Sequence, residues 1–163
     1  WHLCYDSLRC NLHISVTYNP KTYDRFFAPV FTKFPSLEQS LLDDFVIYKA
    51  TGKLPHYFGR DTLYDRPDEV KDAHMWHIHL ELGMNKFEPP ITPKGKHARK
   101  PDQATVQWHR TSDTCLVYVQ NILDENQYSL LAVFHPWAHA EGQDYRQMRE
   151  LAAVAKEFRE DIF

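Results

Sequence analysis

Four segments with the pattern of β-strands follow one another in the second half of the chain, and they limit the fold more than any other feature. The clearest is residues 75–82, where apolar and polar side chains alternate strictly, the period of a half-buried strand. Further strands are predicted at residues 106–111, 115–120 and 128–135, with a turn at residues 112–114 between the first two. So many strands in succession predict a sheet, and other elements must pack on its apolar face to bury it.

Two helices in the first half of the chain can supply that cover. An alternating strand is predicted at residues 12–18, and a helix with one phenylalanine-rich face begins at Asn19. Pro29 should bend or divide this helix. The second helix begins at Ser36, which has the spacing of a capping box, and ends at Gly52.

The chain then follows the order strand, two helices, three or four strands, helix. Residues 53–74 show no clean period and are expected to form a long connection, and residues 144–162 carry a single apolar stripe typical of a helix. We therefore predict an α+β fold in which a mostly antiparallel sheet of three or four strands has helices on one face. At 163 residues the chain suits one core, so residues 12–163 are assigned to a single domain and residues 1–11 to an N-terminal extension.

Charge and hydropathy limit where the protein can act and what it can bind. No apolar run approaches the ~20 residues of a membrane span, and the first residues lack the layout of a signal peptide, which favours a soluble, intracellular protein. The net charge of −3 gives no global attraction to nucleic acid. A local basic patch exists beside several prolines and is either a solvated loop or a contact for RNA. It comprises Lys94, Lys96, His97, Arg99 and Lys100.

Arg110, His135 and His139 are candidates for chemistry on a phosphodiester. Metal-free cleavage needs a base, an acid and a cation on the crowded phosphate. Arg110 precedes the predicted turn and suits the third role, while the two histidines follow the last strand and can move protons. The alternatives are an ion pair between Arg110 and Asp113, and histidines that cap a carbonyl group or stack on Trp137.

A second group of polar residues lies around the strand at residues 75–82. His77, His79 and Glu81 share its polar face and could bind a metal, although they could equally line a groove for RNA. Arg60 and Tyr64 precede them in the long connection, where they could contact phosphate and a base or hold the loop together. The three cysteines have neither zinc-site nor disulfide spacing, and Trp76 and Trp108 are assigned to the core.

Three segments carry a resemblance to a known family. Residues 108–118 (WHRTSDTCLVY) and the order of elements resemble the RelE-like toxins of bacterial toxin–antitoxin pairs. Residues 58–65 (FGRDTLYD) and 77–80 (HIHL) are similar to the YafO branch of that group, and the similarity extends over residues 37–163.

This resemblance implies a ribosome-dependent messenger-RNA endonuclease in the bacterial cytoplasm, neutralised by a small antitoxin encoded beside it. It implies no cofactor, and it makes Arg110 and the end of the last strand the best candidates for the site. Two alternatives remain at this stage: a metal-dependent hydrolase that uses His77 and His79, and a non-catalytic binding module on the same scaffold.

Overall fold

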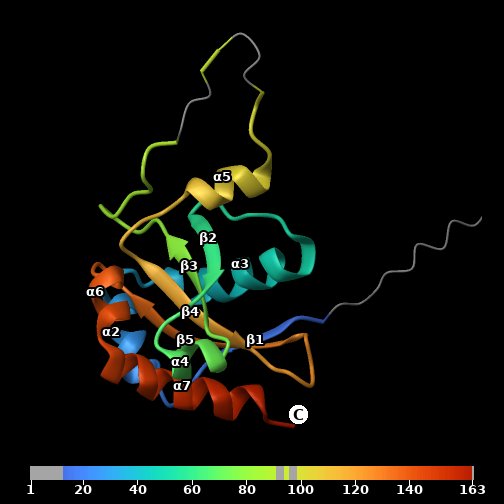
Figure 1. The fold of residues 1–163 in the computed structure, drawn as a ribbon, viewed down its shortest axis with the longest axis vertical. Helices are drawn as coiled ribbons and strands as arrows, with labels where there is room; N and C mark the ends of the chain where they lie inside the picture. Colours follow the sequence, from blue (N-terminus) through green and yellow to red (C-terminus); the bar gives the residue numbers. More distant parts are fainter. Residues whose placement is uncertain (1–12, 91–93, 96–98, 163) are drawn as a thin grey trace, which may run out of the picture.

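One mixed sheet organises the computed structural model, which describes residues 13–90, 94–95 and 99–162; the predicted extension at residues 1–11 lies outside this part. The sheet has five strands in the order β1-β5-β4-β3-β2. Only the β1–β5 pair is parallel (Figure 1). The α+β class and the mostly antiparallel sheet are therefore confirmed. The strands are β1 (Ser15–Tyr18), β2 (Phe58–Leu63), β3 (Trp76–Leu80), β4 (Cys115–Gln120) and β5 (Gln127–Phe134).

Helices α1 (Tyr23–Phe26), α2 (Ala28–Lys33) and α3 (Leu37–Thr51) cover one face of the sheet. Pro29 stands in the first turn of α2, so the predicted division of the first helix is confirmed. Gly52 ends α3 with a left-handed backbone, as predicted, although Ser36 makes no side-chain capping hydrogen bond. The buried side chains on this face include Phe27, Phe31, Leu41, Phe45, Ile78, Leu80, Leu116 and Leu130.

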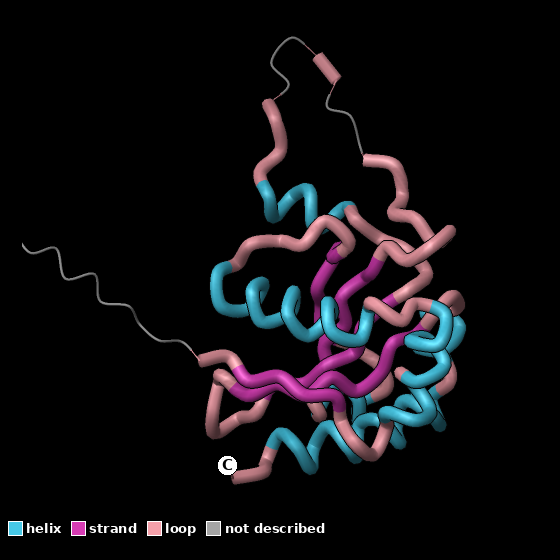
Figure 2. Tube along the Cα trace, turned by 180° about the vertical axis from the view of Figure 1, so that it is seen from behind, coloured by secondary structure: helices cyan, strands magenta, loops and turns pink. Residues whose placement is uncertain are grey.

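The other face is covered as well, and the prediction of helices on one face only was wrong. Helix α7 (Tyr145–Arg159) packs across β4 and β5, with α4 (Asp68–Asp72) beside it, so that α3 and α7 lie on opposite sides of the sheet (Figures 1 and 2). Its apolar stripe, which includes Met148, Leu151, Ala152 and Ala155, meets Val117, Val119 and Leu131. The near-continuous apolar sequences of β4 and β5 require burial on both faces.

The strand predicted at residues 106–111 is instead part of helix α5 (Gln103–His109). Asp102 caps this helix, since its Oδ1 accepts a hydrogen bond of 2.8 Å from the amide of Thr105. The place beside β3 belongs to β2, from the segment predicted to be irregular. A Cβ atom at Gly59 in β2 would lie 2.2 Å from the carbonyl oxygen of Arg110, so this close approach requires glycine.

A bulge in β5 reverses the expected direction of the last side chains of the strand. Val117 pairs with Ala132 but the next residue, Tyr118, pairs with Leu130, which leaves Leu131 as the extra residue. Leu131 therefore packs under α7 while Val133 packs on the opposite face. Strict alternation along residues 128–135 would have placed Leu131 and Val133 on one face together with His135, and the bulge overturns that expectation.

A buried ion pair joins α3 to the edge of the sheet. Lys49 Nζ lies 3.1 Å from Asp61 Oδ2, and the two side chains are 17% and 8% exposed. Tyr118 and Tyr48 also donate hydrogen bonds to Asp61, at 2.9 Å and 3.0 Å. Burial lowers the pKa of Lys49, and the neighbouring Asp61 carboxylate opposes that shift. Three elements, α3, β2 and β4, thus meet at one carboxylate.

Lys49→Met should lower the free energy of unfolding by about 3 kcal/mol, because it leaves Asp61 buried without its cation. Urea denaturation at neutral pH measures this change. Lys21→Met is the matched control, since it breaks the exposed pair of Lys21 with Glu157 and should have little effect. Equal losses in the two variants would contradict a special role for the buried pair.

Candidate functional site

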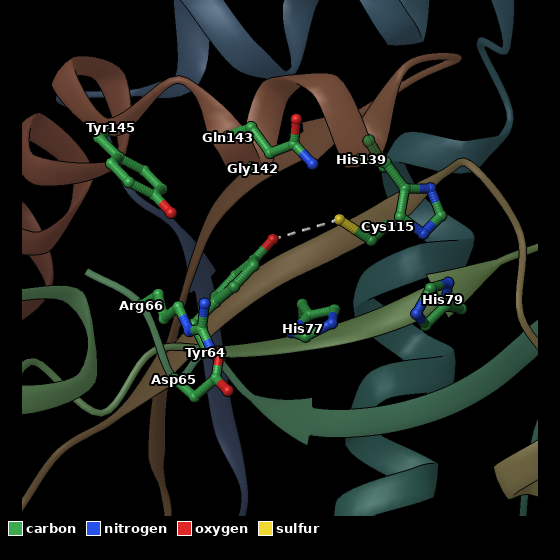
Figure 3. A pocket seen from close by; sticks show the side chains of 11 residues that line it. Tyr64, Asp65, Arg66, His77, His79, Cys115, His139, Gly142, Gln143 and Tyr145 are labelled. Atoms are coloured by element: carbon green, nitrogen blue, oxygen red, sulfur yellow. Dashed lines mark hydrogen bonds between the residues drawn. The ribbon is translucent and has the colours of Figure 1, made fainter. Parts of the chain in front are cut away.

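A pocket of about 390 Å³ opens on the α7 face of the sheet, beside strand β3. His77 and His79 point into it from β3, and His139 faces them from the short helix α6 (Ala138–Gln143) (Figure 3). Tyr64 and Cys115 form the rest of the inner wall. The alternation predicted for residues 75–82 therefore places two imidazoles on one side of the strand, as expected.

His77 belongs to the wall of the pocket. Its ring stacks on Tyr64 with 4.1 Å between centroids, and the Tyr64 hydroxyl lies 3.6 Å from Cys115 Sγ. Burial lowers the pKa of His77 to about 4, with a smaller contribution from neighbouring His79. Its Nδ1 atom is buried without a hydrogen-bond partner in the described chain. Tyr64 is occupied by these contacts, which leaves it poorly placed to stack on a nucleobase.

His79 and His139 form a pair across the pocket. Their ring centroids are 6.1 Å apart. Nδ1 of His79 lies 2.8 Å from the carbonyl oxygen of Ser112 and 3.1 Å from its amide nitrogen, so the ring is fixed through one nitrogen and Nε2 is left for the pocket. Burial lowers the pKa of His79, and the charges of His139 and Arg60 add to this effect, while the hydrogen bond to Ser112 opposes it. The net shift favours the neutral imidazole of His79.

Asp113 orients His139. Its Oδ1 atom lies 2.7 Å from both the backbone amide and Nδ1 of His139. Partial burial acts to raise the pKa of Asp113, but these hydrogen bonds outweigh it and hold the pKa below its usual value. The Asp113 carboxylate thus holds Nδ1 of His139 and leaves Nε2 for a substrate. The side chain of His139 remains 69% exposed.

Two arginines supply positive charge near the imidazoles. Arg66 lines the pocket, and its guanidinium makes no hydrogen bond or ion pair to the residues that the structure describes. Arg60 donates a hydrogen bond of 2.6 Å from Nε to the carbonyl oxygen of Trp108, and its guanidinium lies over the Trp108 ring. One way for Arg60 to hold the loop together is an ion pair with Asp61 or Asp65, but neither pair forms in the described chain, and Asp61 binds Lys49 instead.

Arg110 and His135 lie outside this pocket. The Arg110 guanidinium is 3.3 Å from the carbonyl oxygens of His56 and Phe58, and it borders a separate pocket next to α5. Nδ1 of His135 lies 2.7 Å from Thr114 Oγ1, and the His135 ring packs edge-on against Phe34, apart from the residues that line the imidazole pocket. Burial lowers the pKa of His135. Of the residues proposed for catalysis, only His139 faces the other histidines.

The remaining candidates do not complete a second site. Glu81 Oε2 accepts a hydrogen bond from the amide of Phe87 and borders the α5 pocket, away from His77 and His79. No three His, Cys, Asp or Glu side chains within residues 13–90, 94–95 and 99–162 are grouped to hold a metal. Lys94, Arg99 and Lys100 are exposed on the segment that leaves the body of the domain before α5, and Lys96 lies outside the described residues (Figure 1).

Sequence reasoning missed Asp113 as a partner of His139, Arg66 at the mouth of the pocket, and the exposure of Trp108. Asp113 precedes His139 by 26 positions, and no local spacing connects them. Arg66 lies within residues 53–74, which were predicted to be a long connection, and a lone arginine in such a segment carries no signal. Trp108 was assigned to the core, which was wrong, because it stands on α5 with 54% of its surface exposed.

The fold, a small mixed sheet flanked by helices on both faces, is that of a RelE-like domain. The model of the family of YafO toxins from type II toxin–antitoxin systems matches residues 46–160. The mRNA interferase toxin YafO of Escherichia coli (strain K12) is 35% identical over 124 residues, which cover 74% of this chain and 83% of the relative. The chain belongs to the YafO toxin family. No solved structure matches it.

His77→Phe should make the stability of the protein less sensitive to acid. Between about pH 6.5 and pH 4 the unfolded chain carries a proton on His77 that the folded protein does not, so stability falls as the pH falls through this window. Phenylalanine preserves the stacking on Tyr64 and removes this loss, which reaches about 1.4 kcal/mol per pH unit. Urea denaturation from pH 7 to pH 4 measures the slope.

The control for this experiment is His13→Gln, which removes an exposed imidazole and should keep the wild-type slope. A His77→Phe protein with an unchanged slope would show that the buried ring takes up its proton in the folded state as readily as in the unfolded state.

Proposed function

We propose that this protein is a toxin that cleaves messenger RNA on the ribosome, with His79 and His139 as its acid and base. The relative from E. coli is named an mRNA interferase toxin, and the chain shares its family. The observation that carries the proposal is the pair of imidazoles 6.1 Å apart, each fixed through Nδ1 and each with Nε2 left for a substrate. Two proton carriers at this spacing can flank one phosphate group.

The roles follow from the surroundings of each ring. The lowered pKa of His79 favours its neutral form, so it can accept the proton of a 2′-hydroxyl group as that oxygen attacks the phosphorus. His139, held by Asp113, can donate a proton to the departing 5′-oxygen, so that a cyclic phosphate and a free 5′-hydroxyl result. Arg66 stabilises the extra negative charge on the phosphate. This scheme requires no metal.

The charge of the chain supports dependence on the ribosome. A protein with a net charge of −3 has weak long-range attraction for free RNA, so it gains more from a message that is already held in place. Lys94, Lys96, Arg99 and Lys100 provide a local contact for ribosomal RNA. A small antitoxin encoded beside the toxin neutralises it, and both act in the bacterial cytoplasm. None of the helices described is long and apolar enough to cross a membrane.

His139→Ala and His79→Gln should each reduce cleavage of a defined message by at least about 100-fold, because each removes one proton transfer. Primer extension with purified ribosomes measures the cuts, and the same message without ribosomes should remain intact. Arg110→Ala and His135→Ala serve as comparisons, since both residues lie outside the pocket. Full activity of His139→Ala with loss of activity in His135→Ala would transfer the acid–base role to the end of β5.

Replacing Lys94, Arg99 and Lys100 with alanine should weaken ribosome binding about tenfold at low salt and reduce the dependence of log Kd on log salt. Each lost phosphate contact lowers that slope by about 0.7 for single-stranded RNA. Sedimentation with ribosomes over a salt series measures both quantities. Lys53→Ala, which removes an exposed lysine after α3, is the matched control. Identical salt curves for the triple variant and wild type would remove the loop from ribosome binding.

A further inference from the structure

Trp108 is a large aromatic side chain on the open side of helix α5, with 54% of its surface exposed. The guanidinium carbon of Arg60 lies 4.2 Å from the centroid of its ring. Arg60 Nε is held at 2.6 Å by the carbonyl oxygen of Trp108, which leaves the terminal nitrogens of the guanidinium for other partners. An exposed aromatic ring with a fixed cation beside it offers both stacking and charge to a nucleotide.

This pair adjoins the imidazole pocket. The register of β2 on β3 pairs Phe58 with Leu80 and Asp61 with Ile78, so Arg60 stands next to His79 across the two strands. β2 is an edge strand of the sheet, and its register on β3 shifts between Phe58 and Asp61, so that Gly59 and Arg60 both lie opposite His79 at this edge. The charge of Arg60 also contributes to the lowered pKa of His79. Arg60 therefore lies near the imidazole pair at the β2 edge of the sheet.

The surface beside Trp108 is hollowed and firmly held. A depression of about 220 Å³ lies beside Trp108, and its lining also includes Tyr48, Arg60, Asp61, Ala104 and Gln107. Gln107 Nε2 donates hydrogen bonds to the Tyr48 hydroxyl at 2.8 Å and to the carbonyl oxygen of Gly59 at 3.0 Å, which fixes α5 against β2. A binding surface held in this way loses little entropy when it takes up a flat ligand.

We propose that Trp108 and Arg60 form a nucleotide subsite, in which Trp108 stacks on a base of the message next to the cleaved bond and Arg60 contacts the adjoining phosphate. This inference rests on the proposed function and adds a second point of contact for the RNA. Stacking accepts every base, so the subsite fixes the position of the chain and favours purines through their larger rings. It does not read a sequence.

The test compares Trp108→Leu with Trp108→Phe in the ribosome cleavage assay. Leucine should lower kcat/KM by about 10- to 100-fold, and phenylalanine should retain most of the activity, because an aromatic ring still stacks. Leu123→Ala is the control, since it removes an exposed apolar side chain in the turn at the opposite end of β4. Because Trp108 is exposed, all three variants should unfold at the wild-type urea concentration.

A message with one abasic nucleotide beside the cut site provides a second arm that needs no change in the protein. The abasic message should reproduce the loss seen with Trp108→Leu, and the two changes together should cost no more than either alone. Additive losses, or wild-type kcat/KM for Trp108→Leu, would overturn the subsite while cleavage by the wild type still supports the proposed function. Absence of cleavage by the wild type would overturn the proposed function itself.

The other explanation for the exposure of Trp108 is that it belongs to an interface with a protein partner. If Trp108→Leu cleaved normally and lost only its neutralisation by the antitoxin, Trp108 would belong to that protein interface and the nucleotide subsite would be wrong. Retained neutralisation together with lost cleavage supports the subsite.

Discussion

Burial of β4 and β5 on both faces is the constraint on which the rest of the molecule depends. Their side chains are apolar on each side of the sheet, so α3 must cover one face and α7 the other. Helix α7 makes its main contacts with β4 and β5. The histidine face of β3 therefore stays open beside α7, and α6 encloses it only in part (Figure 3). The candidate site is the part of the sheet that the covering helices leave uncovered.

Hydrogen bonds between neighbouring loop segments fix the shape of the pocket. The carbonyl oxygen of Asp113 accepts a hydrogen bond from the amide of Ala138 at the start of α6, while its side chain holds His139. Asn85 joins the same two segments, since its amide group contacts the Asp113 amide and the carbonyl oxygen of Pro136. Ser112, one residue earlier, fixes His79. The two imidazoles are thus set by one short segment between α5 and β4, which gives the preorganisation that acid–base chemistry needs.

Strand period and helix signals were sufficient to predict β3, β4, β5, α3 and α7, because each has a clear repeat or a marked end. The prediction of a strand at residues 106–111 was wrong because six residues are too few to distinguish the two-residue period of a strand from the 3.6-residue period of a helix. The helix forms here because Asp102 caps its first turn. The faces of the sheet could not be assigned, since the bulge at Leu131 leaves no trace in the alternation. For the site, the His77 and His79 face was predictable from β3 alone, whereas the partners of His139 come from distant segments that only the fold unites.

The electrostatics of the pocket explain how a slightly acidic chain can act on RNA. Burial keeps His77 and His79 neutral, so the pocket contains no buried positive charge that would need a permanent counterion. The cations stand at its margin, with Arg66 at the mouth and Arg60 against Trp108, where water still solvates them before a substrate arrives. Long-range electrostatic attraction therefore contributes little to RNA binding at such a site, and close contacts with a correctly placed RNA contribute more. In the proposed function, a message that the ribosome positions and that stacks on Trp108 would supply those contacts, so that positioning of the RNA and not net charge would govern cleavage.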